Sequence, residues 1–212
     1  KLNSILTHPT ICQIYDLGLH QGVLPFYAMD YVDGLTLEDI ILQVGSLSIG
    51  ATLEVFIKAA EGLSYAHRKG IVHKDIKPAN IMVEKTDDGD ILVKILDFGI
   101  SELTEAVPVN SSTAKHGEEQ DESNQTRNDR KRADPNRAKT QRNQMEIVGS
   151  ALYMSPEQFL GDNLDRRSDI YTIGCTMFET LTGAPPFLEE SFEKLREAHL
   201  HQEPPTLGQA TG

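Results

Sequence analysis

The stretch His73-Lys74-Asp75-Ile76-Lys77-Pro78-Ala79-Asn80 decides the fold of this chain of 212 residues, together with Asp97-Phe98-Gly99, which begins seventeen residues after Asn80. The two segments supply two carboxylates, one amide and one amine. This order and spacing suit phosphoryl transfer from a nucleotide to a hydroxyl group. Either segment alone is weak evidence, because a three-residue Asp-Phe-Gly occurs by chance in many chains. The ordered set is strong evidence.

A hairpin signal separates the two segments. β-rich runs at Ile81-Met82-Val83-Glu84 and Ile91-Leu92-Val93-Lys94-Ile95-Leu96 flank the turn signal Thr86-Asp87-Asp88-Gly89-Asp90. Because a hairpin brings the outer ends of its strands together, we expect Asn80 and Asp97 to lie close in space. Together they offer oxygens to one hard cation, since Mg²⁺ prefers a few oxygen ligands in addition to phosphate oxygens.

At these residues the chain resembles the eukaryotic-type (Hanks-type) serine/threonine protein kinases, including the bacterial ones. The catalytic loop of that family reads His-Arg-Asp-x-Lys-x-x-Asn, and residues 73–80 read His-Lys-Asp-Ile-Lys-Pro-Ala-Asn. The resemblance implies that Asp75 is the base for the substrate hydroxyl and that Lys77 stabilises the transferring phosphate. It implies Asn80 and Asp97 as the Mg²⁺ ligands, ATP as the phosphate donor and a protein Ser or Thr as the acceptor. The expected fold is α+β and two-lobed.

Further motifs of the family follow in order. Residues 149–158 resemble the substrate-positioning loop and the Ala-Pro-Glu motif, with Ser155 in place of alanine. The resemblance makes Ser150 a substrate-positioning residue. By the same resemblance the structural residues are the buried His73 beneath Phe98, Glu157 of the Pro-Glu motif, and Asp169, which bonds back to the backbone of the catalytic loop.

The segment at residues 26–34 resembles the fifth strand and the hinge of these kinases. The resemblance makes Met29 the gatekeeper. It assigns further nucleotide contacts to the hinge at Asp30 and Val32, and to Met82 as an apolar floor beneath the nucleotide.

Some elements of the family have no counterpart in the chain. The glycine-rich loop, the third-strand lysine and the helix with its partner glutamate are expected before Lys1, and the last helices after Gly212. We therefore expect a fragment, with residues 1–33 as a remnant of the small lobe and hinge and residues 34–212 as the helical large lobe. We expect the fragment by itself to be inactive.

Composition and charge narrow the class of protein. Hydrophobic residues make up 39% of the chain, and the formal net charge of −12 argues against nucleic-acid binding and against an anionic membrane surface. Cys12 and Cys175 lie far apart in core-like sequence, so buried free thiols are expected. There is no signal peptide and no apolar run that could span a membrane. We expect a cytoplasmic domain, with an anchor outside these residues left open.

Periodicity predicts strands over residues 11–19 and 24–31, and helices over residues 37–44, 49–69, 156–160, 168–182 and 189–199. In the helix over 49–69, the predicted core stripe is Leu53, Phe56, Ile57, Ala60, Leu63 and Ala66. Apolar surface that small-lobe elements normally cover is expected to be exposed at Ile11, Ile14 and Val23.

An insert at residues 110–144 lies between Asp97 and Glu157, and its only apolar side chains besides proline are alanines. Such a segment cannot bury enough area to offset its ordering entropy, so we expect it to be disordered. Two interpretations stay open. The insert is either a tolerated surface loop, which costs little, or a regulatory loop that is phosphorylated. The candidate phosphorylation sites are Ser111, Ser112, Thr113, Ser123, Thr126 and Thr140.

Three classes of protein compete for these motifs. We favour the catalytic domain of a serine/threonine kinase. A pseudokinase or scaffold is the alternative, although it would need none of the chemistry of Asp75, Lys77, Asn80 and Asp97. A small-molecule phosphotransferase of the aminoglycoside-kinase type shares a His-x-Asp loop, but lacks the Ser-Pro-Glu region and the lysine at position 77.

Overall fold

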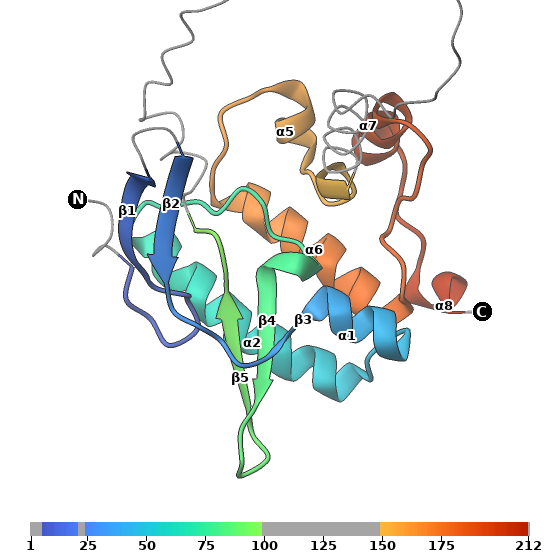
Figure 1. Ribbon diagram of the computed structural model, residues 1–212. Helices are drawn as coiled ribbons and strands as arrows, with labels where there is room; N and C mark the ends of the chain where they lie inside the picture. The colour runs from blue at the N-terminus through green and yellow to red at the C-terminus, as the bar shows by residue number, and fades with distance from the viewer. Residues whose placement is uncertain (1–5, 21–23, 99–148, 212) are drawn as a thin grey trace, which may run out of the picture.

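The computed structural model describes residues 6–20, 24–98 and 149–211 (Figure 1). The insert at 110–144, Val23 and Gly99 therefore lie outside the described residues. The elements are β1 Ile14–His20, β2 Leu24–Met29, β3 Leu35–Thr36, α1 Leu37–Val44, α2 Ile49–Arg68, a 3-10 turn Pro78–Asn80, β4 Ile81–Lys85, β5 Ile91–Ile95, α5 Pro156–Leu160, α6 Arg166–Thr182, α7 Phe192–His201 and α8 Leu207–Ala210. Strands come first and most helices later, so the α+β prediction is confirmed.

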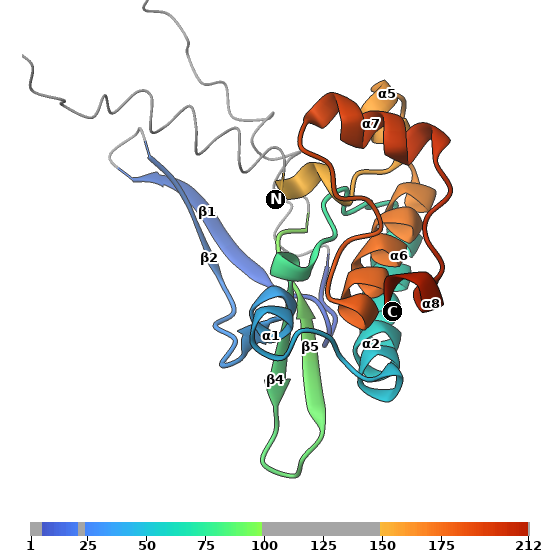
Figure 2. The ribbon, with the colours of Figure 1, turned by 90° about the vertical axis from the view of Figure 1, so that its right-hand side faces the viewer.

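The described strands form two antiparallel sheets, β1–β2 and β3–β4–β5. The β1–β2 sheet projects away from the helices (Figure 2). The β4–β5 hairpin is the predicted one, with Ile81 opposite Ile95. Its turn places Gly89 at φ 89°, a conformation that favours glycine. At the other end of the hairpin, the Leu96 N–H donates to the Asn80 carbonyl at 2.9 Å.

Helix α1 begins and ends where the sequence predicts. The Thr36 side chain accepts a hydrogen bond from the Asp39 N–H at 3.0 Å, which caps the first turn. Gly45 ends the helix at φ 84° and donates its N–H to the Ile41 carbonyl.

Half of the core stripe predicted for α2 is wrong. Phe56, Leu63 and Ala66 are buried as expected, but Leu53, Ile57 and Ala60 are exposed. The residues buried in their place are Thr52, Val55, Ala59 and Gly62. The close approach at Gly62 explains the rotation, because a Cβ there would lie 2.5 Å from Thr10 Oγ1. The helix turns Gly62 toward the segment that contains Thr10.

Helix α6 packs beside α2 (Figure 2). It buries a row of threonines. Thr172, Thr176 and Thr180 are each at most 1% exposed. The Thr176 hydroxyl donates to the Thr172 carbonyl, and the Thr180 hydroxyl to the Thr176 carbonyl, both at 2.8 Å. These bonds within the helix satisfy the hydroxyls, so the polar row can lie in the core.

The prediction that Ile11 is exposed is wrong, since its side chain is 1% exposed. The segment around Ile11 runs parallel to β5 and bridges to Ile95. The Cys12 N–H donates to the Ile95 carbonyl, and the Ile95 N–H to the Thr10 carbonyl, both at 2.9 Å. Hydrogen bonding to β5 therefore draws Ile11 into the main core, whereas Ile14 is half-buried.

A second apolar cluster joins α5 to α7. Its buried members are Ala151, Phe187, Leu195 and Ala198.

Helix α7 starts at Phe192, later than predicted, and α8 was not predicted. Both cysteines are buried and free, as predicted. None of the helices in the described ranges has the length and apolar character that a membrane crossing needs.

Candidate active site

The loop between α2 and the 3-10 turn carries the predicted catalytic pair. The Asp75 side chain is 49% exposed, and its Oδ2 lies 2.9 Å from Lys77 Nζ. The same Nζ donates to Ser150 Oγ at 2.8 Å. The loop thus holds a carboxylate that is open to solvent, with a cation beside it. Ser150, which precedes α5 by only a few residues, completes this group.

Asn80 is oriented by Asp75. The Asn80 side chain is buried, and its Nδ2 donates to the Asp75 carbonyl at 2.8 Å and to the Asp75 carboxylate at 3.1 Å. Because the amide hydrogens face Asp75, the amide oxygen is the atom that Asn80 can offer to a cation.

Asp97 lies just beyond β5, at the end of the hairpin where Asn80 precedes β4. Its backbone is left-handed, with φ 60°, a conformation that is uncommon outside glycine and is found at functional sites. Tyr27 on β2 faces this carboxylate. The negative charge of Asp97, together with burial and a hydrogen bond to Asp97, raises the pKa of the Tyr27 hydroxyl.

The oxygens of Asn80 and Asp97 fit a hard cation. One is an amide oxygen whose orientation is fixed by Asp75, and the other belongs to a carboxylate. Mg²⁺ takes oxygen ligands of this kind and completes its shell with waters and phosphate oxygens. Protein kinases generally use ATP and Mg²⁺.

The buried His73 ring connects the catalytic loop to the end of β5. The ring is 2% exposed, its Nε2 lies 2.7 Å from the Leu96 carbonyl, and the Asp75 N–H donates to its Nδ1 at 3.3 Å. The ring meets Phe98 edge-on, with centroids 4.6 Å apart. Burial lowers the pKa of the imidazole. With both nitrogens engaged and the ring buried, His73 is a packing residue and not a base for substrate.

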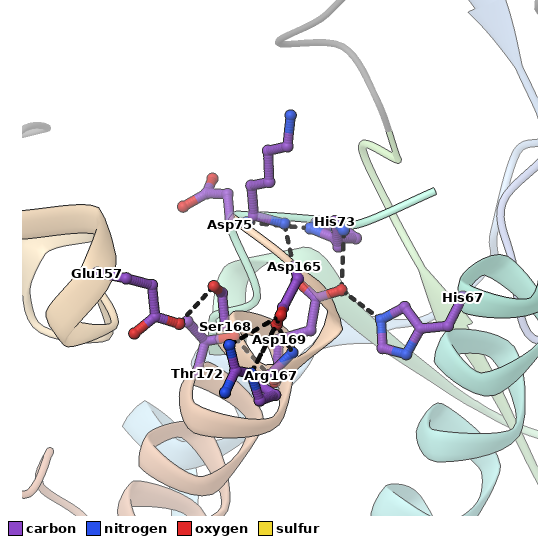
Figure 3. A network of polar contacts seen from close by, with 10 residues as sticks. His67, His73, Asp75, Glu157, Asp165, Arg167, Ser168, Asp169 and Thr172 are labelled. Atoms are coloured by element: carbon purple, nitrogen blue, oxygen red, sulfur yellow. Dashed lines mark hydrogen bonds and ion pairs between the residues drawn. The ribbon is translucent and has the colours of Figure 1, made fainter. Parts of the chain in front are cut away.

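Asp169 fastens the same loop to α6 (Figure 3). Its side chain is fully buried. The carboxylate accepts hydrogen bonds from the N–H groups of His73 and Lys74, both at 2.9 Å, and lies 2.7 Å from His67 Nε2. Lys74 has a left-handed backbone with φ 72°. Three donors on one buried carboxylate hold this strained peptide in place.

Glu157 lies at the start of α5 and faces α6 (Figure 3). Its carboxylate accepts a hydrogen bond from the Ser168 hydroxyl. Burial raises the pKa of Glu157, but the bond from Ser168 and other donors outweigh it, and the pKa is lowered overall. The residue is therefore held charged between the two helices.

The residues predicted to contact nucleotide lie on separate elements. Met29 ends β2, half-buried Val32 lies in the following connection, and Met82 pairs with Thr36 across β4 and β3. Asp30 has several partners of its own. Its carboxylate accepts from the Tyr15 hydroxyl, from the Gln13 N–H at 3.1 Å and from Lys94 Nζ at 3.4 Å.

Sequence reasoning missed several residues that shape the site. Tyr27 faces Asp97, His67 binds Asp169, and Lys94 binds Asp30. Each contact joins elements that are distant in the sequence, so no local sequence pattern predicts it. Gln158 is different, because Ser155-x-x-Gln158 is a recognisable capping box. That pattern predicts the start of α5, but not the further bond that Gln158 makes.

Comparison with known proteins agrees with this geometry. The protein kinase domain family matches residues 1–117 and 130–208. The serine/threonine-protein kinase PknB of Mycobacterium tuberculosis is 36% identical over 202 residues, which cover 94% of this chain and 27% of that protein. The probable serine/threonine-protein kinase SCO3848 of Streptomyces coelicolor is 34% identical over 202 residues, covering 94% of this chain and 25% of that protein.

A solved structure shares the fold. The crystal structure of a mutant kinase domain of Mycobacterium tuberculosis PknI has a TM-score of 0.61 and 24% identity, and covers 99% of this chain and 60% of that one. The chain spans only about a quarter of the length of the curated relatives. The matches nevertheless extend over most of the chain, and its motifs follow in the family order. The chain therefore belongs to the protein kinase family and is similar to its bacterial Hanks-type serine/threonine members.

Proposed function

We propose that the protein containing this chain transfers the γ-phosphoryl group of ATP to Ser or Thr hydroxyls of protein substrates. The observation that carries the proposal is the group formed by Asp75, Lys77, Asn80 and Ser150. Lys77 Nζ lies 2.9 Å from Asp75 Oδ2 and 2.8 Å from Ser150 Oγ, and Asn80 Nδ2 donates to the same Asp75 oxygen at 3.1 Å. The family and its relatives support the same reaction.

Asp75 is the residue we assign as the base. Its carboxylate is half-exposed, so a substrate hydroxyl can reach it. As the hydroxyl oxygen bonds to the γ-phosphorus, the bond from that phosphorus to the bridging oxygen breaks and ADP leaves. The hydroxyl proton passes to the Asp75 carboxylate. Asn80 and Lys77 fix the direction in which this carboxylate faces.

Lys77 and Ser150 would position the transferring phosphoryl group and the protein substrate, respectively. Lys77 places a positive charge beside Asp75, where negative charge on the transferring phosphoryl group would otherwise repel the carboxylate. Ser150, bonded to Lys77, lies where the segment that leads into α5 meets the catalytic loop. It is the residue we assign to positioning the substrate.

We assign Mg²⁺ to the amide oxygen of Asn80 and the carboxylate of Asp97. A cation bound there supplies charge neutralisation for the nucleotide phosphates. The nucleotide base would lie against the hinge after Met29, with Asp30 and Val32 on one side and Met82 below. The Asp30 carboxylate has partners within the protein, and the Asp30 N–H donates to the Gln13 carbonyl at 2.9 Å. The contact we assign to Asp30 would therefore come from its backbone carbonyl, whose oxygen has two lone pairs. Residues 1–33 and 34–212 are the proposed small-lobe and large-lobe parts, and we propose that they work in the cytoplasm.

The test compares the unchanged full-length protein with Asp75→Asn. We expect phosphoryl transfer to a serine/threonine peptide to fall about 10²–10⁴-fold, since that is the usual contribution of a positioned base. Nucleotide affinity should stay nearly the same. Asp87→Asn, an exposed carboxylate in the β4–β5 turn, is the matched control. Near-normal transfer by Asp75→Asn would refute the assignment. Nucleotide binding without any transfer in the unchanged protein would favour a pseudokinase.

A further inference from the structure

Gln158 joins two parts of the site through the two ends of its side-chain amide. It is the third residue of α5, and its Oε1 accepts a hydrogen bond from the Ser155 N–H at 2.9 Å, which completes the capping box. Its Nε2 donates to the Lys74 carbonyl at 2.7 Å. One side chain therefore both caps the helix and grips the residue that precedes Asp75.

The peptide that Gln158 grips is already strained. Lys74 has φ 72°, a left-handed conformation that residues other than glycine adopt only when their surroundings hold them there. Asp169 fixes the N–H side of Lys74 at 2.9 Å, and Gln158 fixes its carbonyl side. Because the Lys74 carbonyl belongs to the peptide unit that leads into Asp75, holding that carbonyl fixes the direction of the Asp75 backbone.

We infer that Gln158 is a positioning residue for Asp75, which couples the seating of α5 to the orientation of the proposed base. The inference rests on the proposed function. It depends on amide chemistry, because an amide accepts from Ser155 and donates to Lys74 at neutral pH, whereas an ionised carboxylate can only accept. A carboxylate would keep the first bond and lose the second.

The chain contains a matched control for the capping role. Helix α8 has the same bond from the N-cap N–H to a glutamine, in which Gln209 Oε1 accepts from the Thr206 N–H at 2.9 Å. Gln209 is exposed at the surface. Glutamate is the residue that the capping box most often carries at this position. A change from glutamine to glutamate therefore preserves the bond to the N-cap N–H in both helices, adds one negative charge in both variants, and breaks the bond to the Lys74 carbonyl in Gln158→Glu alone.

The experiment compares Gln158→Glu and Gln209→Glu in the full-length protein. We expect Gln158→Glu to lower kcat by about 10- to 100-fold, the scale of a small misplacement of a catalytic group. The KM for ATP should change by less than about 2-fold, because the hinge is untouched. Gln209→Glu should change neither. An unchanged kcat in Gln158→Glu, or an equal loss in both variants, would overturn the inference.

A pH profile separates positioning from general damage. A protonated glutamate regains an O–H donor, so the deficit of Gln158→Glu relative to the unchanged protein should shrink as the pH falls from about 8 toward the ordinary carboxyl range. A deficit that stays constant with pH would contradict the inference.

Amide hydrogen exchange in the full-length protein gives a result that does not depend on activity. The N–H of Lys74 should exchange faster in Gln158→Glu than in Gln209→Glu, because the left-handed backbone of Lys74 has lost the bond to its carbonyl. Equal exchange rates would overturn the inference even if the protein transfers phosphate. If the unchanged protein transfers none, the proposed function fails, and the exchange experiment still decides whether Gln158 holds the loop.

Discussion

Protonation of His199 should weaken the packing of α7 at mildly acidic pH. The His199 side chain is 5% exposed. Its ring lies among Phe187, Phe159 and Tyr171, with centroid distances of 4.9, 5.3 and 5.8 Å. Its Nδ1 lies 2.8 Å from the Tyr171 hydroxyl. Burial lowers the pKa of His199 from its ordinary 6.5 to about 4, since a charged imidazole would lose its hydration among these rings.

The sign of the effect follows from this lowered pKa. As the pH falls from 6.5 to about 4, the unfolded chain takes up a proton at His199 before the folded chain does. The free energy of unfolding therefore falls through this window and is fully retained above it. A difference of that size between folded and unfolded pKa corresponds to about 3 kcal/mol, from roughly 1.4 kcal/mol for each pKa unit. That is a large share of the stability of an ordinary domain.

Urea unfolding, followed by circular dichroism between about pH 7 and pH 4, measures how the free energy of unfolding depends on pH. Other groups titrate in the same range, so the quantity to compare is the difference in unfolding free energy between the unchanged chain and His199→Phe. We expect that difference to shift by about 3 kcal/mol across the window, in favour of the variant at low pH. The matched control is His201→Phe, on the same helix with a side chain 64% exposed. Equal pH dependence in the two variants would refute the reasoning.

Three further predictions concern buried acceptors and the proposed metal. Asp169→Ala should lower the unfolding free energy by about 3 kcal/mol or more, because buried N–H groups lose their acceptor; a loss below about 1 kcal/mol in urea unfolding would contradict this. Asp97→Ala should remove Mg²⁺-dependent nucleotide binding in the full-length protein, and calorimetric titrations with and without Mg²⁺ should show it; an unchanged Mg²⁺ dependence would place the metal elsewhere. Tyr153→Phe removes the hydroxyl that donates to Glu179 at 2.5 Å, and should cost about 2 kcal/mol at pH 7. Because burial raises the folded pKa of Glu179, that carboxyl takes up a proton first in the folded chain, so the cost should shrink as the pH falls; a cost that grows on acidification would be inconsistent with this.

The parts of the site that lie close in sequence were predictable. Asn80 and Asp97 flank one hairpin, and hairpin pairing alone brings them together. The start of α1 at Thr36 follows from a local capping pattern. In each case the interacting residues lie within a short stretch of chain, so one local sequence pattern contains both of them.

The sequence could not predict which face of α2 is buried. The helix is apolar around most of its circumference, so two overlapping stripes satisfy the same periodicity. Contact with Thr10 at Gly62 selects the face with Val55 and Ala59, and leaves Ile57 60% exposed. The selection comes from a segment far away in the sequence. The burial of Ile11 against β5 has the same origin, since its parallel bridge to Ile95 has no local signature.

Two carboxylates of the candidate site, Asp169 and Asp75, contribute unequally to stability. Asp169 is fully buried and accepts from two backbone N–H groups, so it stabilises the loop strongly. The pair of Asp75 and Lys77 is 49% and 23% exposed, and a partly exposed ion pair contributes about 1 kcal/mol or less. Stability therefore gives little reason for the second pair. We infer that this pair places a solvent-exposed carboxylate beside a cation, and that the placement depends on the buried Asp169, which binds the N–H groups of His73 and Lys74.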